Sequence, residues 1–438
     1  MNRHHRQWLK SFLVSGLMTP LFASAAPGTI SDTPLFLTTS VEPNIFFVLD
    51  DSGSMEWETL VQGGTSGRPN IGGWTGNYYI LPSANNGQDQ SYIASGCSPA
   101  CYPYVTPSEA SVAGAWRVRN HNYNALYYNP AVTYKPWEGT DASNNPLYND
   151  ASYPQAPVDP NNPTGDQLDL TSNITFYNYD AISGWYTDTL YPAQYYTWTD
   201  DNSNGAVDAS DSHTQVKITS TTTSYNGSAN RTDCASAPTC TYAEELQNFA
   251  NWYTYYRKRG SVAKSAVGSV VDSATNSRIG LQVFNGGRLR DAASIDTASN
   301  KLALQQSLYG TAMPCDSTSC PGTPTRTALQ SVGDLFEGNN SPILPAASGG
   351  SCQQNFSVVL SDGFWNGASP SICNTDGDGN TKFDGASYAE TYSDTLGDVA
   401  MPYYERAPKT VLPDEVPHIT GIHTASTQLM FTYYVALG

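Results

Sequence analysis

Residues 44–54 read NIFFVLDDSGS, and this stretch decides the fold. The run from Ile45 to Leu49 is apolar without interruption, and it lies between Pro43 with Asn44 on one side and Asp50 on the other. An apolar run of this length is typical of a strand that is buried on both faces of a parallel sheet. The stretch therefore predicts a central strand with an acidic loop at its carboxyl end.

Strand and helix patterns alternate along the rest of the chain. Apolar runs that predict further strands occupy residues 278–284, 356–360 and 429–437. Helical periodicity marks residues 302–308, 327–336 and 393–404, and residues 242–259 with 262–274 read as one long or broken helix. This alternation predicts an α/β fold with a doubly wound, mostly parallel sheet.

Residues 56–241 interrupt the alternation with a segment that is rich in Tyr, Asn, Pro, Gly, Ser and Thr. The frequent aromatic residues and two cysteine pairs favour a folded, irregular or β-rich insertion over a disordered one. We therefore expect one domain at residues 26–438, with its core strands and helices at 40–55 and 242–438 and the insertion between them.

The first 25 residues have the order of a secretory signal peptide. Arg3, Arg6 and Lys10 precede an apolar stretch from Phe12 to Phe22, and small residues follow as far as Ala25. The apolar stretch is shorter than the ~20 residues of a spanning helix, and no later stretch is long and apolar enough either. We expect cleavage after Ala25 and export through the periplasm, to the cell surface or the medium.

The formal net charge of −18 argues against nucleic acid as a partner, because phosphate binding needs clustered Lys and Arg. Arg257, Lys258 and Arg259 form the one basic cluster of the sequence. We expect these three side chains to be a solvated helix end near the negative pole of the helix dipole.

Eight cysteines occur as close pairs, and an even count in an exported chain favours disulfides. The candidate pairs are Cys97/Cys101, Cys234/Cys240, Cys315/Cys320 and Cys352/Cys373. Pairing between near neighbours is the working prediction, although sequence alone does not fix the connectivity.

Asp50, Ser52 and Ser54 alternate in the loop that follows the predicted central strand. Open α/β sheets bind their ligands at the carboxyl ends of the strands. One carboxylate and two hydroxyls are hard oxygen donors that suit Mg²⁺, Mn²⁺ or Ca²⁺. The alternative is that Asp50 and Ser52 only cap a helix.

Two further segments accompany this loop: residues 322–329 (GTPTRTAL) open a predicted helix, and residues 358–363 (VVLSDG) end a predicted strand. The three segments together resemble the metal-ion-dependent adhesion site of von Willebrand factor A domains. The resemblance assigns Asp50, Ser52, Ser54, Thr323 and Asp362 to Mg²⁺ or Mn²⁺, with Thr325 as the competitor of Thr323. It also implies an incomplete ligand set that an acidic residue of a partner completes.

Two acidic loops have calcium-binding spacing. The first carries oxygen-bearing side chains at the alternating and later positions of a D-x-N-x-N-G loop, namely Asp200, Asn202, Asn204, Asp208 and Asp211. The second carries Asn374, Asp376, Asp378 and Asp384 but lacks a carboxylate at its twelfth position. We expect Ca²⁺ in the first loop and consider the second a weaker candidate; the alternative is an ordinary Asn/Gly turn.

Several longer strings resemble the PilY-type tip proteins of bacterial type IV pili. They are residues 126–137 (LYYNPAVTYKPW), 248–257 (NFANWYTYYR), 361–366 (SDGFWN) and 398–404 (DVAMPYY). The resemblance implies a location at the pilus tip and roles in pilus assembly, twitching motility and surface attachment. It implies minor pilins, other pilus components, or host and abiotic surface ligands as partners. Family members usually continue into a β-propeller, so we expect this chain to be a fragment or a truncated form.

Two other functions compete with adhesion. In the first, the chain is a structural or assembly factor whose calcium sites only stabilise the fold. In the second, it is a metal-dependent hydrolase, which needs a general base or nucleophile beside the metal. The histidines that follow the signal peptide are scattered, and G-x-S-x-G, H-E-x-x-H and phosphate-loop motifs are absent from the sequence. We therefore expect that the chain is not an enzyme.

Overall fold

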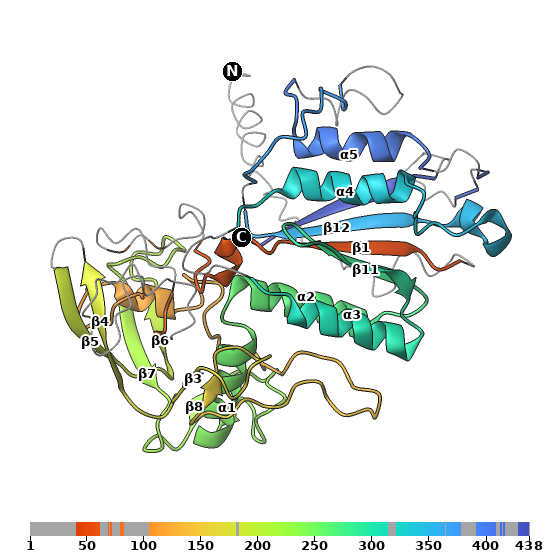
Figure 1. Cartoon of the computed structure of the whole chain (residues 1–438). Helices are drawn as coiled ribbons and strands as arrows, with labels where there is room; N and C mark the ends of the chain where they lie inside the picture. Colours follow the sequence, from red (N-terminus) through yellow and green to blue (C-terminus); the bar gives the residue numbers. More distant parts are fainter. Residues whose placement is uncertain are drawn as a thin grey trace, which may run out of the picture. The chain divides into compact units, whose positions relative to one another are not determined.

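Strand β1 (Asn44–Leu49) lies in the middle of a five-stranded sheet in the described part of the chain (Figure 1). The order across the sheet is β11 (Gly287–Ser294), β10 (Arg278–Val283), β1, β12 (Asn355–Ser361) and β13 (Met430–Ala436). β1 pairs in parallel with β10 and β12, and β12 pairs in parallel with β13. Every residue of β1 is buried, so the predicted central strand is confirmed.

The computed structural model describes residues 41–61, 69, 71, 79–82, 105–180, 184–313, 321–363, 365–377, 391–408, 412–413, 415–416 and 428–437. All of these residues belong to one compact unit, residues 39–438. The predicted signal peptide lies outside the described residues. Within the described ranges, no helix is both long and apolar enough to cross a membrane.

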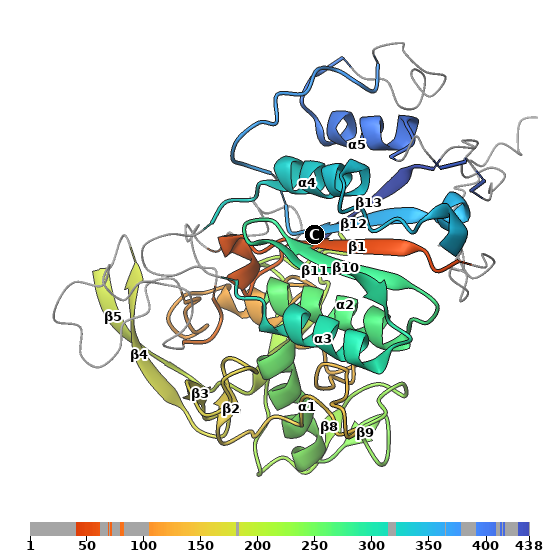
Figure 2. The same ribbon diagram turned by 45° about the vertical axis from the view of Figure 1, so that its right-hand side comes forward.

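Helices cover both faces of the sheet (Figures 1 and 2). One face carries α4 (Thr325–Glu337) and α5 (Leu396–Glu405). The other face carries α2 (Arg259–Ser273) and α3 (Ala298–Gly310). The predicted mixed α/β architecture with a largely parallel central sheet is confirmed.

Edge strand β11 was not predicted from the sequence. It runs antiparallel to β10, and half of its residues are exposed, with Ala292 the buried one. An edge strand has one hydrogen-bonded neighbour and needs little apolar surface. The stretch GRLRDAAS therefore carries no apolar run that pattern analysis could detect.

The glycine in the middle of β10 makes room for a core aromatic ring. Phe46 of β1 lies opposite Gly280 in the strand register, and its ring meets that of Phe336 edge to face, with the centroids 5.8 Å apart. A Cβ atom on Gly280 would approach the Phe46 ring to 2.5 Å. Because protein cores are close-packed, the ring has little freedom to move aside.

We expect Gly280→Ala to lower the free energy of unfolding by about 1–3 kcal/mol, the usual cost of an overpacked core. Urea unfolding monitored by tryptophan fluorescence measures this change. Gly310→Ala, at the end of α3, is the matched control, because an added Cβ there meets nothing within 4 Å. Equal stabilities of the two variants would contradict the packing argument.

The segment between η1 (Gly53–Glu56) and α1 adds no strand to the central sheet in its described residues. It forms two-stranded antiparallel sheets instead. Their strands are β2 (Ala156–Pro157) with β3 (Gln167–Leu168), β4 (Ile174–Asp180) with β5 (Gly184–Leu190), β6 (Gln194–Thr199) with β7 (Ser212–Lys217), and β8 (Tyr225–Asn226) with β9 (Thr239–Cys240). The short helix η4 (Ala115–Arg119) lies in the same segment.

Helix α1 (Tyr242–Tyr255) packs into this inserted segment and not onto the sheet (Figure 2). The indole nitrogen of Trp252 donates a hydrogen bond to the carbonyl of Leu126 at 2.8 Å. The Tyr128 hydroxyl donates to the Glu245 carboxylate at 2.8 Å. These aromatic residues are buried, so they join α1 to the insertion and are not available to an external ligand.

Candidate metal centre

The candidate site begins where β1 and β12 end side by side. The two strands are parallel, with Leu49 opposite Leu360, so Asp50 and Ser361 emerge at the same edge of the sheet. The backbone amide of Asp50 still donates to the carbonyl of Leu360 at 2.9 Å. The backbone pairing of the two strands therefore sets the distance between the two acidic loops.

A continuous chain of hydrogen bonds joins the two loops. Asp50 accepts from the Ser52 backbone amide on Oδ1 at 2.8 Å and from the Ser361 hydroxyl on Oδ2 at 2.6 Å. The hydroxyls of Ser52 and Ser54 lie 3.1 Å apart. The Ser54 hydroxyl donates to Asp362 Oδ1 at 2.9 Å. Four of the five predicted ligands, Asp50, Ser52, Ser54 and Asp362, thus lie in one row of oxygen atoms.

The third segment docks beside this row through one backbone contact and through the side chain of Asn285. The amide of Gly53 donates to the carbonyl of Pro321 at 3.1 Å. The side-chain amide of Asn285 donates both to Asp51 Oδ1, at 2.8 Å, and to the carbonyl of Gly322, at 3.0 Å. The structure therefore brings all three predicted segments together at the carboxyl edge of the sheet.

Both candidate threonines of that segment are buried. Thr323 is held by Asn366, which accepts from the Thr323 amide at 2.8 Å and donates to the Thr323 carbonyl at 2.9 Å. Thr325 is 1% exposed, and its hydroxyl has no hydrogen-bond partner among the residues that the structure describes. Because buried hydroxyls normally have a partner, an oxygen without one beside the site fits a ligand that the chain itself does not supply.

The basic cluster is buried, so the prediction of a solvated helix end is wrong. The chain turns between α1 and α2, and Arg257, Lys258 and Arg259 lie at this corner with exposed fractions of 1%, 8% and 1%. Each of them forms an ion pair with an acid. The pairs are Arg257 with Glu58 at 2.9 Å, Lys258 with Glu56 at 2.5 Å, and Arg259 with Asp362 at 2.6 Å. Buried charges require such partners, and the sequence did not reveal these, because they are distant along the chain.

Burial changes the acidity of Asp50. It raises the pKa of this carboxyl to about 6; the negative charge of Asp362 adds to the increase, and hydrogen bonds from Ser361 and Ser52 oppose it. The folded state therefore holds the proton more tightly than the unfolded state does. Protonation of Asp50 in the folded state therefore adds to the free energy of unfolding. The full gain is present below the pKa of the unfolded state, about 4, and it is lost as the pH rises through the folded-state pKa of about 6. A cation beside Asp50 would offset the loss.

The oxygen atoms of the site match the preferences of a hard divalent cation. The row offers two carboxylates and two hydroxyls, with Thr323 and Thr325 on the adjoining segment, and contains no sulfur or imidazole ligand. In the described ranges, no group of three or more Asp, Glu, His or Cys side chains is placed to hold a metal ion. An ion here would therefore rely on hydroxyls for part of its ligand set.

We expect Asp50→Asn to stabilise the protein at pH 7 in the absence of divalent ions, by up to about 3 kcal/mol, since each pKa unit corresponds to 1.36 kcal/mol. The neutral amide removes the cost of burying a charge and keeps an acceptor for Ser52. Thermal unfolding in EDTA at several pH values measures the effect, and the advantage of the variant should vanish near pH ~4. A wild type that equals the variant at pH 7 would refute the expectation.

All five residues of the first predicted calcium loop lie in the connection between β6 and β7. Asp200 accepts from the amides of Asn204 and Gly205 at 3.1 and 2.8 Å, and Gly205 has a φ of 76° that suits glycine. Asn202 and Asn204 both donate to Asp208 Oδ2. Hydrogen bonds from Ser210 lower the pKa of Asp208 well below its usual range. The loop is thus closed around an ionised carboxylate, and calcium binding remains a prediction.

We expect Ca²⁺ to raise the melting temperature of the wild type. In Asp208→Asn most of this increase should be lost, because a neutral amide replaces a charged oxygen ligand. Differential scanning fluorimetry with and without CaCl₂ provides the measurement. Asp141→Asn is the matched control, since Asp141 also accepts local hydrogen bonds in an exposed turn but lies outside any calcium pattern. An equal loss of the calcium effect in both variants would contradict a specific site.

The second calcium loop is described only in part. Asn374 and Asp376 are described, whereas Asp378 and Asp384 lie outside the described residues. The amide of Thr375 donates to Asp398 at 2.6 Å, which places this segment at the start of α5.

The cysteine predictions have different outcomes. Cys234 and Cys240 form a disulfide, as predicted. Cys352 and Cys373 are free, so their predicted pairing is wrong. Cys352 precedes the amino end of β12, where its thiol contacts Glu415, whereas Cys373 follows the carboxyl end and adjoins the segment at α5. The length of the strand separates them. The remaining four cysteines, Cys97, Cys101, Cys315 and Cys320, lie outside the described residues.

Sequence reasoning missed three residues that shape the site. Ser361 donates to Asp50, Asn285 connects the Asp51 and Gly322 loops, and Arg259 binds Asp362. Ser361 and Asn285 follow or end parallel strands next to β1, so their positions were detectable from the predicted strand ends. Arg259 gave no such signal, because it lies at a break between helices.

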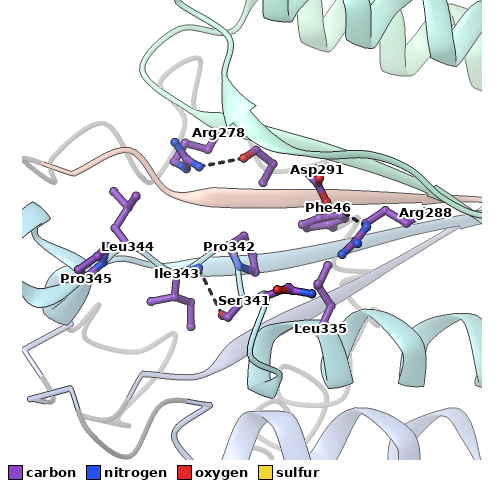
Figure 3. Close-up of a pocket in the computed structure, with 12 residues that line it drawn as sticks. Phe46, Arg278, Arg288, Asp291, Leu335, Ser341, Pro342, Ile343, Leu344 and Pro345 are labelled. Carbon is purple, nitrogen blue, oxygen red and sulfur yellow. Dashed lines mark hydrogen bonds and ion pairs between the residues drawn. The ribbon is translucent and has the colours of Figure 1, made fainter.

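In the described part of the chain, two recesses lie beside strands β10 and β11, one on the face that carries α4 and one on the face that carries α3. One, of about 550 Å³, lies near the start of β10 and the loop after α4, and includes Phe46, Arg278 and Ile343 (Figure 3). The other, of about 590 Å³, is lined by Asp51, Asn285, Val283 and Leu289 and opens beside the oxygen row. The second recess adjoins the candidate centre through Asp51 and Asn285.

The site and fold define a mixed α/β unit with an oxygen-rich loop cluster at the carboxyl edge of its sheet. Comparison with known proteins adds a similarity to type IV pilus biogenesis factor PilY1 of Pseudomonas aeruginosa. The chain is 27% identical over 422 residues to PilY1 of strain UCBPP-PA14, which covers 90% of this chain and 30% of that protein. It is 24% identical over 432 residues to PilY1 of strain PAK, which covers 92% of this chain and 31% of that protein.

The chain thus spans about three tenths of the length of these curated relatives. No protein-family model matches the chain, and no solved structure is a significant match. The comparisons therefore support a PilY-like protein.

Proposed function

We propose that this chain is a divalent-ion-dependent binding module of a type IV pilus protein that supports pilus assembly and surface attachment. The observation that carries the proposal is the row of oxygens from Asp50 through Ser52 and Ser54 to Asp362. It is supported by the name of the relatives, which are type IV pilus biogenesis factors. We further propose that the unit is a von Willebrand factor A-type domain and that the row is its adhesion site.

In this proposal, the protein supplies only part of the coordination sphere of a Mg²⁺ or Mn²⁺ ion. The hydroxyls of Ser52, Ser54 and a threonine, Thr323 or Thr325, with the Asp50 carboxylate, are the direct or water-mediated ligands. The ion then attracts a carboxylate of a partner, because an incomplete oxygen set leaves a divalent charge poorly compensated. A minor pilin or another exported pilus component is the proposed partner, and host or abiotic surface ligands with an acidic group are the other candidates.

The surroundings of the row suit a protein partner. Trp365 is 43% exposed and adjoins Asn366, which holds Thr323. The recess lined by Val283 and Leu289 opens on the other side, beside Asp51. Aromatic anchors and apolar recesses are frequent at the centres of protein interfaces, where they supply much of the binding energy. A partner that placed an acid on the ion could therefore use both features.

The decisive experiment titrates Mg²⁺, Mn²⁺ and Ca²⁺ into the purified exported protein and into Asp50→Ala by calorimetry. We expect at least a tenfold loss of Mg²⁺ and Mn²⁺ affinity, about 1.4 kcal/mol or more, because the variant lacks a charged ligand. Asp208→Asn is the control, since it alters the separate β6–β7 loop. Equal Mg²⁺ binding by wild type and Asp50→Ala would rule out the site.

The same pair of variants separates adhesion from a purely structural role. Under the proposal, cells with Asp50→Ala secrete the protein normally but attach to surfaces poorly. If the ions only stabilise the fold, Asp50→Ala cells keep pili and attachment, and Asp208→Asn reduces secretion instead. Counting surface pili by electron microscopy and attached cells by staining distinguishes these outcomes.

A further inference from the structure

Arg259 lies inside the candidate metal centre and is fully engaged there. Its Nη1 atom donates to Asp362 Oδ2 at 2.6 Å, and both side chains of this ion pair are at most 3% exposed. Its Nε and Nη2 atoms donate to the carbonyl of Thr59 at 2.9 and 2.6 Å. The guanidinium also lies over the Trp57 ring, 4.8 Å from the centroid. This cation is therefore fixed in position by four separate contacts.

The position of Arg259 affects the charge of the site. Asp362 has one oxygen on Ser54 and the other on Arg259, so its carboxylate is shared between the oxygen row and a permanent cation. With Asp50 ionised, the two carboxylates and the guanidinium leave one net negative charge. A divalent ion entering this row would meet a like charge within a few ångström, where repulsion in a buried site is strong.

The neighbouring basic residues show that this contact is specific. Arg257 and Lys258 are buried at the same corner, but they pair with Glu58 and Glu56 and contact none of the candidate ligands in the described structure. Of the triplet, Arg259 is the member that pairs with a candidate metal ligand. The ion pairs of Arg257 and Lys258 already join this corner to the inserted segment. The contact between Arg259 and Asp362 is therefore not needed for that purpose alone.

We propose that Arg259 is an internal countercation that competes with the divalent ion for Asp362 and thereby lowers the ion affinity of the site. The inference rests on the proposed function, because it concerns the same centre. It assigns Arg259 as a positioning residue and not as a ligand. Since the same guanidinium holds the Thr59 carbonyl, ion binding is coupled to the first residues of the insertion.

The test compares Arg259→Gln with Arg257→Gln by calorimetric titration of MgCl₂ and MnCl₂ into the whole protein. Both variants lose a buried cation and should be less stable than wild type. We expect Arg259→Gln to bind Mg²⁺ and Mn²⁺ about tenfold more tightly, because the competing charge is gone. Arg257→Gln should keep the wild-type affinity. Arg259→Lys should stay within about twofold of wild type, since it retains the charge.

The outcomes distinguish this inference from the proposed function. If the wild type binds Mg²⁺ and Mn²⁺ and Arg259→Gln binds them equally or more weakly, the inference is overturned and the proposed function stands. Binding by Arg259→Gln but not by wild type supports the inference and refutes the proposed function. An absence of binding in both proteins overturns both. Equal tightening in Arg259→Lys and Arg259→Gln also overturns the inference, because charge would then not be the cause.

A measurement on the wild type covers the case in which Arg259→Gln does not fold. The Nε–H signals of buried arginines can be followed by ¹⁵N NMR, with Arg257→Lys and Arg259→Lys used for assignment. We expect MgCl₂ to shift the Arg259 signal and to leave the Arg257 signal unchanged. An Arg259 signal that stays in place at saturating Mg²⁺ would overturn the inference.

Discussion

The parallel pairing of β1 with β10 and β12 is the constraint on which the rest of the structure depends. A strand with a hydrogen-bonded neighbour on each side and a helix layer on each face must be apolar throughout, as residues 45–49 are. Where the strand ends, its neighbours end with it. The polar groups that follow β1 and β12 are therefore forced together at one edge, and Asp50, Ser361 and Asp362 meet there without any requirement on the intervening sequence.

Bringing carboxylates together at a buried edge has a cost that the structure offsets locally. Asp50 accepts hydrogen bonds from the Ser52 amide and the Ser361 hydroxyl, which stabilise its ionised form, while burial raises its pKa to about 6. Asp362 is neutralised by Arg259. These are different solutions, since a hydrogen bond leaves the carboxylate available to a cation, whereas an ion pair already supplies one. The two acids therefore differ in how their charge is compensated, and the sequence patterns of the three loops do not reveal this difference.

The sequence predicts some parts of this arrangement because they are local or periodic. The apolar run of β1, the strand-ending loops and the helices that begin near Thr325 and Leu396 all leave such patterns. Edge strand β11 does not, because one exposed face needs no apolar run. The partners of Arg257, Lys258 and Arg259 are also invisible, since a basic triplet reads the same whether it faces solvent or buried acids. The predicted disulfide between Cys352 and Cys373 is wrong because it was based on their separation along the sequence and did not take account of strand β12, which lies between them.

The corner that holds the basic triplet also joins the two ends of a segment that consists of the insertion and helix α1. The amide of Arg259 donates to the carbonyl of Trp57 at 3.1 Å, and Arg257 pairs with Glu58, so the chain leaves and re-enters the α/β unit at one point. A segment whose ends meet in this way can grow, shrink or be exchanged at little cost to the sheet, because loop closure depends only weakly on length. The insertion is therefore the part of the molecule in which related proteins can diversify their surface while they keep the same edge of oxygen atoms.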